Sequence, residues 1–170
     1  MFYLEQIQAE DVKTLFDVIQ ELERAGLSDQ EIADRFDTRD FEEANILIWA
    51  LNDTNAHRRN ILVYPKRIDP IGNEIFGLKK IDRELSLRKN GPLHNALSHL
   101  PNAKRPLSAE GITKIEDLDV RDFSHQLFGE ELDAQLEKRL NFLKKLARQP
   151  GITLYQINIE MIRFVYRWQN

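Results

Sequence analysis

Residues 26–36 read GLSDQEIADRF, and this stretch decides how the first third of the chain is organised. Gly26 tolerates the left-handed backbone conformation that commonly ends a helix. Ser28, followed three residues later by Glu31, has the pattern of a capping box that begins another helix. The apolar residues that come next recur at helical spacing, so the pattern predicts a short helix that ends near Phe36.

Amphipathic patterns predict a helix on each side of this stretch. The first helix is expected over residues 10–25, where apolar residues recur every three or four positions. Its stripe consists of Val12, Leu15, Phe16, Ile19 and Leu22. The third helix is expected to be capped by Asp40 with Glu43 and to end near Leu51. Its second half, ILIWAL, is apolar on nearly every side, which predicts burial in the protein or in an interface.

A β-hairpin is predicted directly after the three helices. Residues 61–64 (ILVY) and 74–78 (EIFGL) are prone to form strands, and the turn-forming segment DPIGN separates them. Pro65 cannot donate a backbone hydrogen bond, so the first strand is expected to lie at a sheet edge or to end there.

The stretch at residues 26–36 resembles the second helix of helix-turn-helix proteins, and helices followed by a hairpin resemble a winged helix. The resemblance covers at most residues 10–81 and identifies no particular family. It implies that the third helix enters the DNA major groove. That helix begins with the acidic residues Asp37, Asp40, Glu42 and Glu43 against a single Arg39. Because carboxylates are repelled by the phosphates, we expect no conventional insertion.

The second half of the chain is predicted to be helical after an irregular connector. Residues 82–107 are basic and rich in turn-forming residues. Thr113 and Glu116 have the spacing of a further capping box. A long helix is expected over residues 130–148, with a stripe formed by Leu132, Leu136, Leu140, Leu143 and Leu146.

The last segment places apolar residues on one helical face, although residues 152–159 also suit a strand. Its stripe consists of Leu154, Ile157, Met161, Phe164, Val165 and Trp168. The predicted fold is therefore mainly α with one short β-hairpin. It consists of a winged-helix-like three-helix head over residues 1–81, the connector, and an antiparallel helical pair within residues 108–170. A single domain is the alternative to this division.

Composition limits the classes of protein to which the chain can belong. The sequence is 42% hydrophobic and 31% charged, which is typical of globular domains, and no apolar run approaches the roughly 20 residues that span a bilayer. The chain contains no Cys, so disulfides, thiolate nucleophiles and Cys-ligated zinc are excluded. The N-terminal residues lack the pattern of a secretory signal, and we expect a cytoplasmic location.

The net charge of −4 is unevenly distributed along the chain. Residues 1–56 carry 4 Lys and Arg against 14 Asp and Glu, whereas residues 57–105 carry 11 against 4. The basic segment either packs against the acidic helices or contacts nucleic acid or an acidic protein. The nucleic-acid-binding candidates are Arg58, Arg59, Lys66, Arg67, Lys79, Lys80, Arg83, Arg88 and Lys89.

No group of residues predicts catalysis, and we expect neither a catalytic residue, nor a cofactor, nor a metal. The segment GNEIFGLK departs from a phosphate-binding loop because Lys79 lies one position late. Asp69 and Glu74 lack the lysine two residues later that nuclease hairpins require. His94 and His99 lie five residues apart, whereas four is the favoured spacing for a shared metal on a helix.

The C-terminal helix predicts a contact with another macromolecule. Aromatic residues and Arg are enriched in interface cores, and the interface candidates are Phe164, Tyr166, Arg167 and Trp168. Phe164 and Trp168 also suit the protein's own core. The sequence therefore predicts a non-enzymatic interaction or adaptor protein with a protein partner or a second copy. The alternative is a DNA-binding regulatory protein that contacts phosphates through the basic hairpin and connector.

Overall fold

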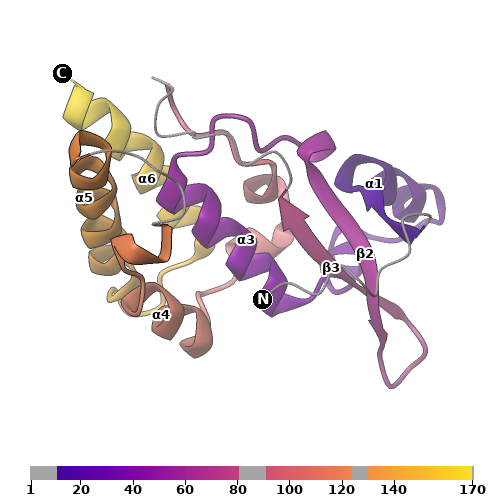
Figure 1. The fold of residues 1–170 in the computed structure, drawn as a ribbon. Helices are drawn as coiled ribbons and strands as arrows, with labels where there is room; N and C mark the ends of the chain where they lie inside the picture. The colour runs from indigo at the N-terminus through magenta and orange to yellow at the C-terminus, as the bar shows by residue number, and fades with distance from the viewer. Residues whose placement is uncertain (1–10, 81–90, 124–129, 170) are drawn as a thin grey trace.

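The computed structural model describes residues 11–80, 91–123 and 130–169, and for residues 130–132 and 165–169 it describes the backbone only. The described chain is mainly helical with a small three-stranded antiparallel sheet (Figure 1). The α-helices are α1 (Leu15–Arg24), α2 (Asp29–Ala33), α3 (Thr38–Leu51), α4 (Ala109–Glu116), α5 (Glu130–Ala147) and α6 (Leu154–Gln169). The strands are β1 (Lys13–Thr14), β2 (Ile61–Ile68) and β3 (Glu74–Lys80).

Side-chain caps define where the first three helices begin. Ser28 accepts a hydrogen bond from the backbone amide of Glu31, which confirms the predicted start of α2. The first helix begins later than predicted, because residues 13–14 pair with β2 and Thr14 caps α1. The predicted cap of α3 was wrong: Asp37 is the N-cap residue, and it accepts from the amide of Asp40.

The predicted hairpin is confirmed and is longer than expected. β2 is the middle strand, and β1 covers only its first part, where Lys13 pairs with Val63. Pro65 pairs with Phe76 on β3, and the register shifts between Pro65 and Arg67. Among the described residues, none pairs with the outer side of β2 beyond β1, and a proline and an irregular register are features that protect such an edge.

The described part of the connector, residues 91–107, contains two short 3₁₀ helices, η5 (Ala96–His99) and η6 (Pro101–Lys104). The capping box predicted at Thr113 was wrong, because α4 starts earlier, at Ser108. The Ser108 hydroxyl accepts from the amide of Gly111, and the carboxylate of Glu42 in α3 accepts from both the amide and the hydroxyl of Ser108. A side chain 66 residues away therefore fixes the start of α4.

The two last helices follow the predicted pattern. Leu136, Leu140, Leu143 and Leu146 of α5 are buried, whereas the side chain of Leu132 lies outside the description. Residues 154–159 are helical, which resolves the alternatives left open there. The rings of Phe142 and Phe164 stack with centroids 4.8 Å apart, so α5 and α6 pack against each other.

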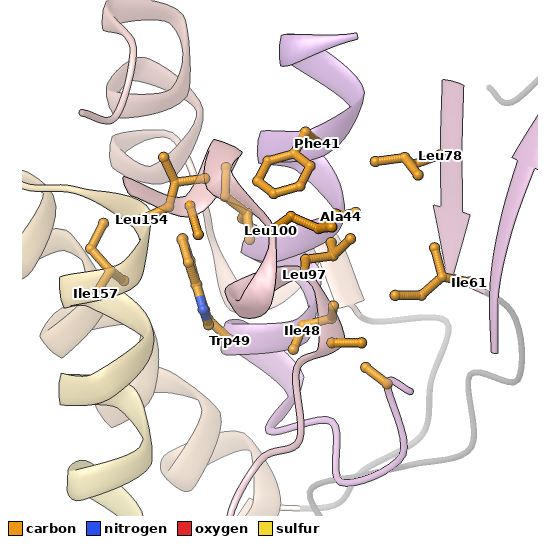
Figure 2. Packing of buried hydrophobic residues seen from close by; sticks show 14 of the residues in the cluster. Phe41, Ala44, Ile48, Trp49, Ile61, Leu78, Leu97, Leu100, Leu154 and Ile157 are labelled. Atoms are coloured by element: carbon orange, nitrogen blue, oxygen red, sulfur yellow. The ribbon is translucent and has the colours of Figure 1, made fainter. Parts of the chain in front are cut away.

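Helix α3 forms the centre of the core and contacts β3, α4, α5 and α6 (Figure 2). In its apolar second half, Ile46, Ile48, Trp49 and Ala50 are buried, whereas Leu47 and Leu51 are half-buried. One cluster of buried side chains joins residues on both sides of the predicted connector, including Leu15 and Ile61 as well as Ile157. The head and tail therefore share one core.

Hydrogen bonds of buried polar side chains connect separate segments within this core. Asn95 donates hydrogen bonds of 2.7 Å to Asn45 Oδ1 and of 3.0 Å to Asn158 Oδ1. The indole nitrogen of Trp49 also donates to Asn158 Oδ1, at 3.0 Å. Arg139 of α5 donates to the carbonyls of Trp49 and Ala50 at the end of α3, where a cation favours the helix dipole. Burial lowers the pKa of Arg139 to about 10.

Candidate functional site: a groove beside the hairpin

The cations of the hairpin lie against the acidic start of α3. Lys66 Nζ is 2.8 Å from Asp40 Oδ1, and Arg67 forms an ion pair with Asp37. At the end of β3, Lys80 is buried and lies 3.4 Å from Asp53. Three of the nucleic-acid-binding candidates thus have acidic partners within the chain, as the intramolecular interpretation of the charge pattern expects.

Asp40 is the centre of this contact. Its Oδ2 accepts a 3.0 Å hydrogen bond from the Tyr64 hydroxyl and a 3.3 Å hydrogen bond from the amide of Leu78. Burial and the negative charge of Asp40 raise the pKa of Tyr64 to about 12. Burial also acts to raise the pKa of Asp37, but hydrogen bonds from Arg67 and the Asp40 amide outweigh it, so this pKa lies below its usual value.

The remaining basic candidates lie on other parts of the chain or outside the described residues. Arg58 and Arg59 lie in a 3₁₀ helix, η3 (Arg58–Asn60), and the guanidinium of Arg59 lies 4.8 Å from the centre of the Phe16 ring. Lys79 lies on β3 and is half-buried. Arg83, Arg88 and Lys89 fall outside the described residues.

An open groove of about 980 Å³ lies between α3, the hairpin and α4. Its apolar lining is formed by Ala44, Ile46, Leu47, Leu78 and Leu118. Five cationic side chains line it, namely Arg39, Lys66, Lys79, Lys80 and Lys114. Four acidic side chains, Asp40, Glu43, Asp117 and Asp122, lie among them, so the groove carries both signs of charge.

The α4 side of the groove is also held by ion pairs. Lys114 of α4 pairs with Glu43 of α3, and Arg39 lies 3.2 Å from Glu43 and 3.3 Å from Glu110. Burial and the neighbouring charge of Arg39 lower the pKa of Lys114. The sequence did not predict this groove, because it is assembled from segments that are widely separated along the chain.

The interface candidates of α6 are only partly described. Phe164 is 7% exposed and stacks on Phe142, so within this chain it is a core residue. Tyr166, Arg167 and Trp168 are helical residues of α6 whose side chains lie outside the description.

The turn of the hairpin exposes two large apolar side chains that the sequence analysis missed. Ile68 is 72% exposed and Ile71 is 83% exposed. The turn is well ordered by hydrogen bonds, since Asp69 Oδ1 accepts from the amides of Ile71 and Asn73, and Asp69 and Asn73 are also joined through their backbones. The signal in the sequence was an isoleucine on each side of a turn-forming Asp-Pro pair.

Three histidines, His57, His94 and His99, gather at one side of the connector. The rings of His57 and His94 meet edge to face with centroids 5.7 Å apart. Burial and the nearby His57 and His99 lower the pKa of His94. Within the described ranges, no three His, Asp or Glu side chains are arranged to hold a metal ion.

Comparison with known proteins gives no assignment: the chain matches no protein-family model, and no curated protein is significantly similar to it. In the part of the chain that the structure describes, no helix is both long enough and apolar enough to span a membrane.

Proposed function

We propose that the protein is a non-enzymatic interaction protein whose groove between α3, the hairpin and α4 binds a polypeptide segment of a protein partner. The observation that carries this proposal is the composition of the groove. An apolar floor that includes Leu47 and Leu118 is surrounded by cations and carboxylates, and its volume of about 980 Å³ is at the upper end for binding pockets. A polypeptide can bury apolar side chains on such a floor while its polar groups meet both signs of charge.

The charges favour a polypeptide over nucleic acid. A surface that binds phosphates needs an excess of available positive charge. In the groove the cations outnumber the acidic side chains by only one. Lys66, Lys80 and Lys114 each lie within ion-pair distance of a carboxylate of the same chain. Binding a phosphate at these lysines would therefore compete with existing ion pairs.

The scaffold in this proposal is winged-helix-like, with the antiparallel pair α5 and α6 completing the core. Support comes from the element order, in which three helices are followed by a hairpin. Because α3 contacts β3, α4, α5 and α6 and the face that lines the groove carries Asp40 and Glu43, the proposal does not use α3 as a reading helix. Tyr166 and Arg167 at the end of α6 form a second proposed contact, argued from their residue types.

Selection of a random peptide library on the purified protein tests the groove. The variants Leu47→Asn and Arg39→Glu alter the floor and the rim, and Arg39 is 60% exposed at its side chain. Tyr155→Ser is the matched control, because Tyr155 is an exposed apolar residue of α6 outside the groove lining. Circular dichroism verifies that each variant folds.

We expect enriched peptides to bind the wild type and the Tyr155→Ser variant alike and to bind both groove variants at least about tenfold more weakly. The proposal is rejected if no peptide is enriched, or if the selected peptides bind both groove variants as well as the wild type.

A second candidate function is DNA binding through the hairpin. It is favoured by the exposure of Arg67, whose side chain is 53% accessible despite its ion pair, and by the exposed isoleucines of the turn. Apolar side chains act as wedges in some complexes with the DNA minor groove. Asp69, within the turn, opposes this function because it would face the phosphates.

A further inference from the structure

The turn of the hairpin is a preorganised apolar projection without a partner in the described chain. Figure 1 shows the loop between β2 and β3 extending beyond the helices. Ile68 and Ile71 are the two most exposed large hydrophobic residues among those described. Because the Asp69 side chain already fixes the backbone of the turn, covering the two isoleucines costs little further ordering.

The projection and the groove lie close together on the same molecule. Lys66 and Leu78 of the hairpin line the groove, and Ile68 follows Lys66 by only two residues. We propose that a second copy of this chain occupies the groove, with the Ile68–Ile71 turn of each protomer seated on the floor beside Leu47 and Leu118 of the other. This inference rests on the proposed function, because it names the polypeptide that the groove binds.

The chemistry of the turn matches that of the groove. Residues 68–74 carry two carboxylates, Asp69 and Glu74, and no cation, whereas the groove lining carries five cations against four carboxylates. Ile68 and Ile71 supply apolar surface to a floor that is itself apolar. In this arrangement the two carboxylates meet a lining with one cation in excess as the isoleucines become buried.

The proximity of turn and groove also determines the symmetry. When each copy offers one turn and one groove, a two-fold axis lets both contacts form at once and closes the assembly as a dimer. Strand addition is not the route, because Pro65 and the irregular register lie on the part of β2 that pairs, in the described chain, with β3 alone. On the outer side of β3, Phe76 is hydrogen-bonded to residues 35 and 37 and Leu78 to the side chain of Asp40.

Sedimentation velocity on the full chain is the first test. Between about 1 and about 200 µM, the mass should rise from that of the 20.0 kDa chain toward twice that value. Replacing both isoleucines, Ile68→Ser with Ile71→Ser, should weaken the dimer at least about tenfold, because the apolar surface that it buries is removed. The Tyr155→Ser variant should associate as the wild type does. The inference is overturned if the chain stays monomeric, or if the turn substitutions leave the dissociation constant of the dimer unchanged.

Cross-linking tests the contact itself, and the absence of Cys from the chain removes any background. Two single variants, Ile71→Cys and Leu118→Cys, are mixed and oxidised, and the disulfide-linked heterodimer is measured on a non-reducing gel. We expect a yield several times that obtained from Ile71→Cys mixed with Tyr155→Cys. Equal yields, or a predominant link between two Ile71→Cys chains, overturn the turn-in-groove arrangement.

The peptide selection separates the failure of this inference from the failure of the proposed function. If groove-dependent peptides are found but the chain remains monomeric at every concentration, the groove binds polypeptides and the second copy is not its occupant. If neither peptides nor a second copy bind, both proposals fail together.

Discussion

The hydroxyl of Tyr64 on β2 lies 3.0 Å from the Asp40 carboxylate in the first turn of α3. This hydrogen bond joins the hairpin to the central helix across 24 residues of sequence. Asp40 also accepts from Lys66 and from the amide of Leu78, so one carboxylate ties together both long strands and the helix. The position of the hairpin beside the groove depends on this residue.

Stability at high pH should report on the Tyr64 hydrogen bond. The pKa of Tyr64 is raised from 10.0 to about 12 in the folded protein, so the folded state holds this proton more tightly than the unfolded chain does. The resulting stabilisation is fully present below the unfolded pKa and is lost as the pH rises through the folded one. We expect the free energy of unfolding to fall between about pH 10 and about pH 12.

The Tyr64→Phe variant is the control for this measurement, because it keeps the ring and removes the ionising hydroxyl. Urea denaturation at several pH values should show a smaller alkaline loss in the variant than in the wild type. Identical losses in the two proteins would contradict the prediction.

Gly77 should not tolerate a side chain. A Cβ atom at this position would lie 2.5 Å from Asp40 Oδ2 and 2.6 Å from Tyr64 Cε2. We expect Gly77→Ala to destabilise the protein by about 1–3 kcal/mol, as overpacking does in cores, measured by urea denaturation. In a Tyr64→Ala background the same substitution should cost less, because the ring that it would strike is gone. Equal costs in both backgrounds would show that crowding is not the cause.

Asn158 should be required as an acceptor in the core. In Asn158→Leu, the Trp49 indole nitrogen loses its hydrogen-bond acceptor, and the Asn95 side chain loses one of its two acceptors. A buried donor without an acceptor costs about 1–3 kcal/mol, and we expect a loss of stability of this size in denaturant melts followed by circular dichroism. The loss should be smaller in a Trp49→Phe background. If the losses in the free energy of unfolding from Asn158→Leu and Trp49→Phe simply added, the predicted coupling between Asn158 and Trp49 would be contradicted.

The His57–His94 contact predicts loss of stability in mild acid. The pKa of His94 lies below the ordinary histidine value of 6.5, because burial and the neighbouring His57 and His99 oppose its protonation. As the pH falls, His94 is therefore protonated at a higher pH in the unfolded chain than in the folded protein. The stabilisation is fully present above pH 6.5 and is lost as the pH falls through the pKa of the folded state. Thermal melts of His94→Gln between about pH 7 and about pH 5 should show a shallower decline than those of the wild type.

Binding to duplex DNA decides between the two candidate functions. Fluorescence anisotropy with a labelled duplex at about 50 and about 200 mM salt should show no micromolar binding, because Lys66, Arg67 and Lys80 are ion-paired within the chain. Micromolar binding that weakens steeply with salt would instead support DNA binding through the hairpin. Arg67→Gln would then be expected to reduce the affinity.

Local patterns predicted the helices and the hairpin well, because their causes lie within a few residues of each other. The leucine stripe of α5 and the Ser28 cap of α2 are features of this kind. Errors arose where a distant residue decided the outcome. The start of α4 was misplaced because Glu42 and Ser108, 66 residues apart, fix it together.

The candidate site was harder to predict for the same reason. The basic segment gave the positions of Lys66 and Arg67, and the sequence left open whether they face solvent or the acidic helices. Only the folded chain brings them to Asp40 and Asp37. The exposure of Ile71 could not be predicted either, since the local sequence of the turn is the same whether other parts of the chain cover this isoleucine or leave it in solvent.

The central place of α3 has a consequence for the order in which the chain can fold during synthesis. Trp49 and Met161 of α6 belong to the same buried cluster, but Trp49 is synthesised 112 residues earlier. At ordinary elongation rates these 112 residues take roughly 5 to 20 s to add. During that time α4, α5 and α6 are added one after another, so the contacts of α3 with these helices are incomplete until the end. We therefore expect the nascent chain to expose apolar surface of α3 until α6 has emerged, and a chain truncated before α5 to keep that surface exposed.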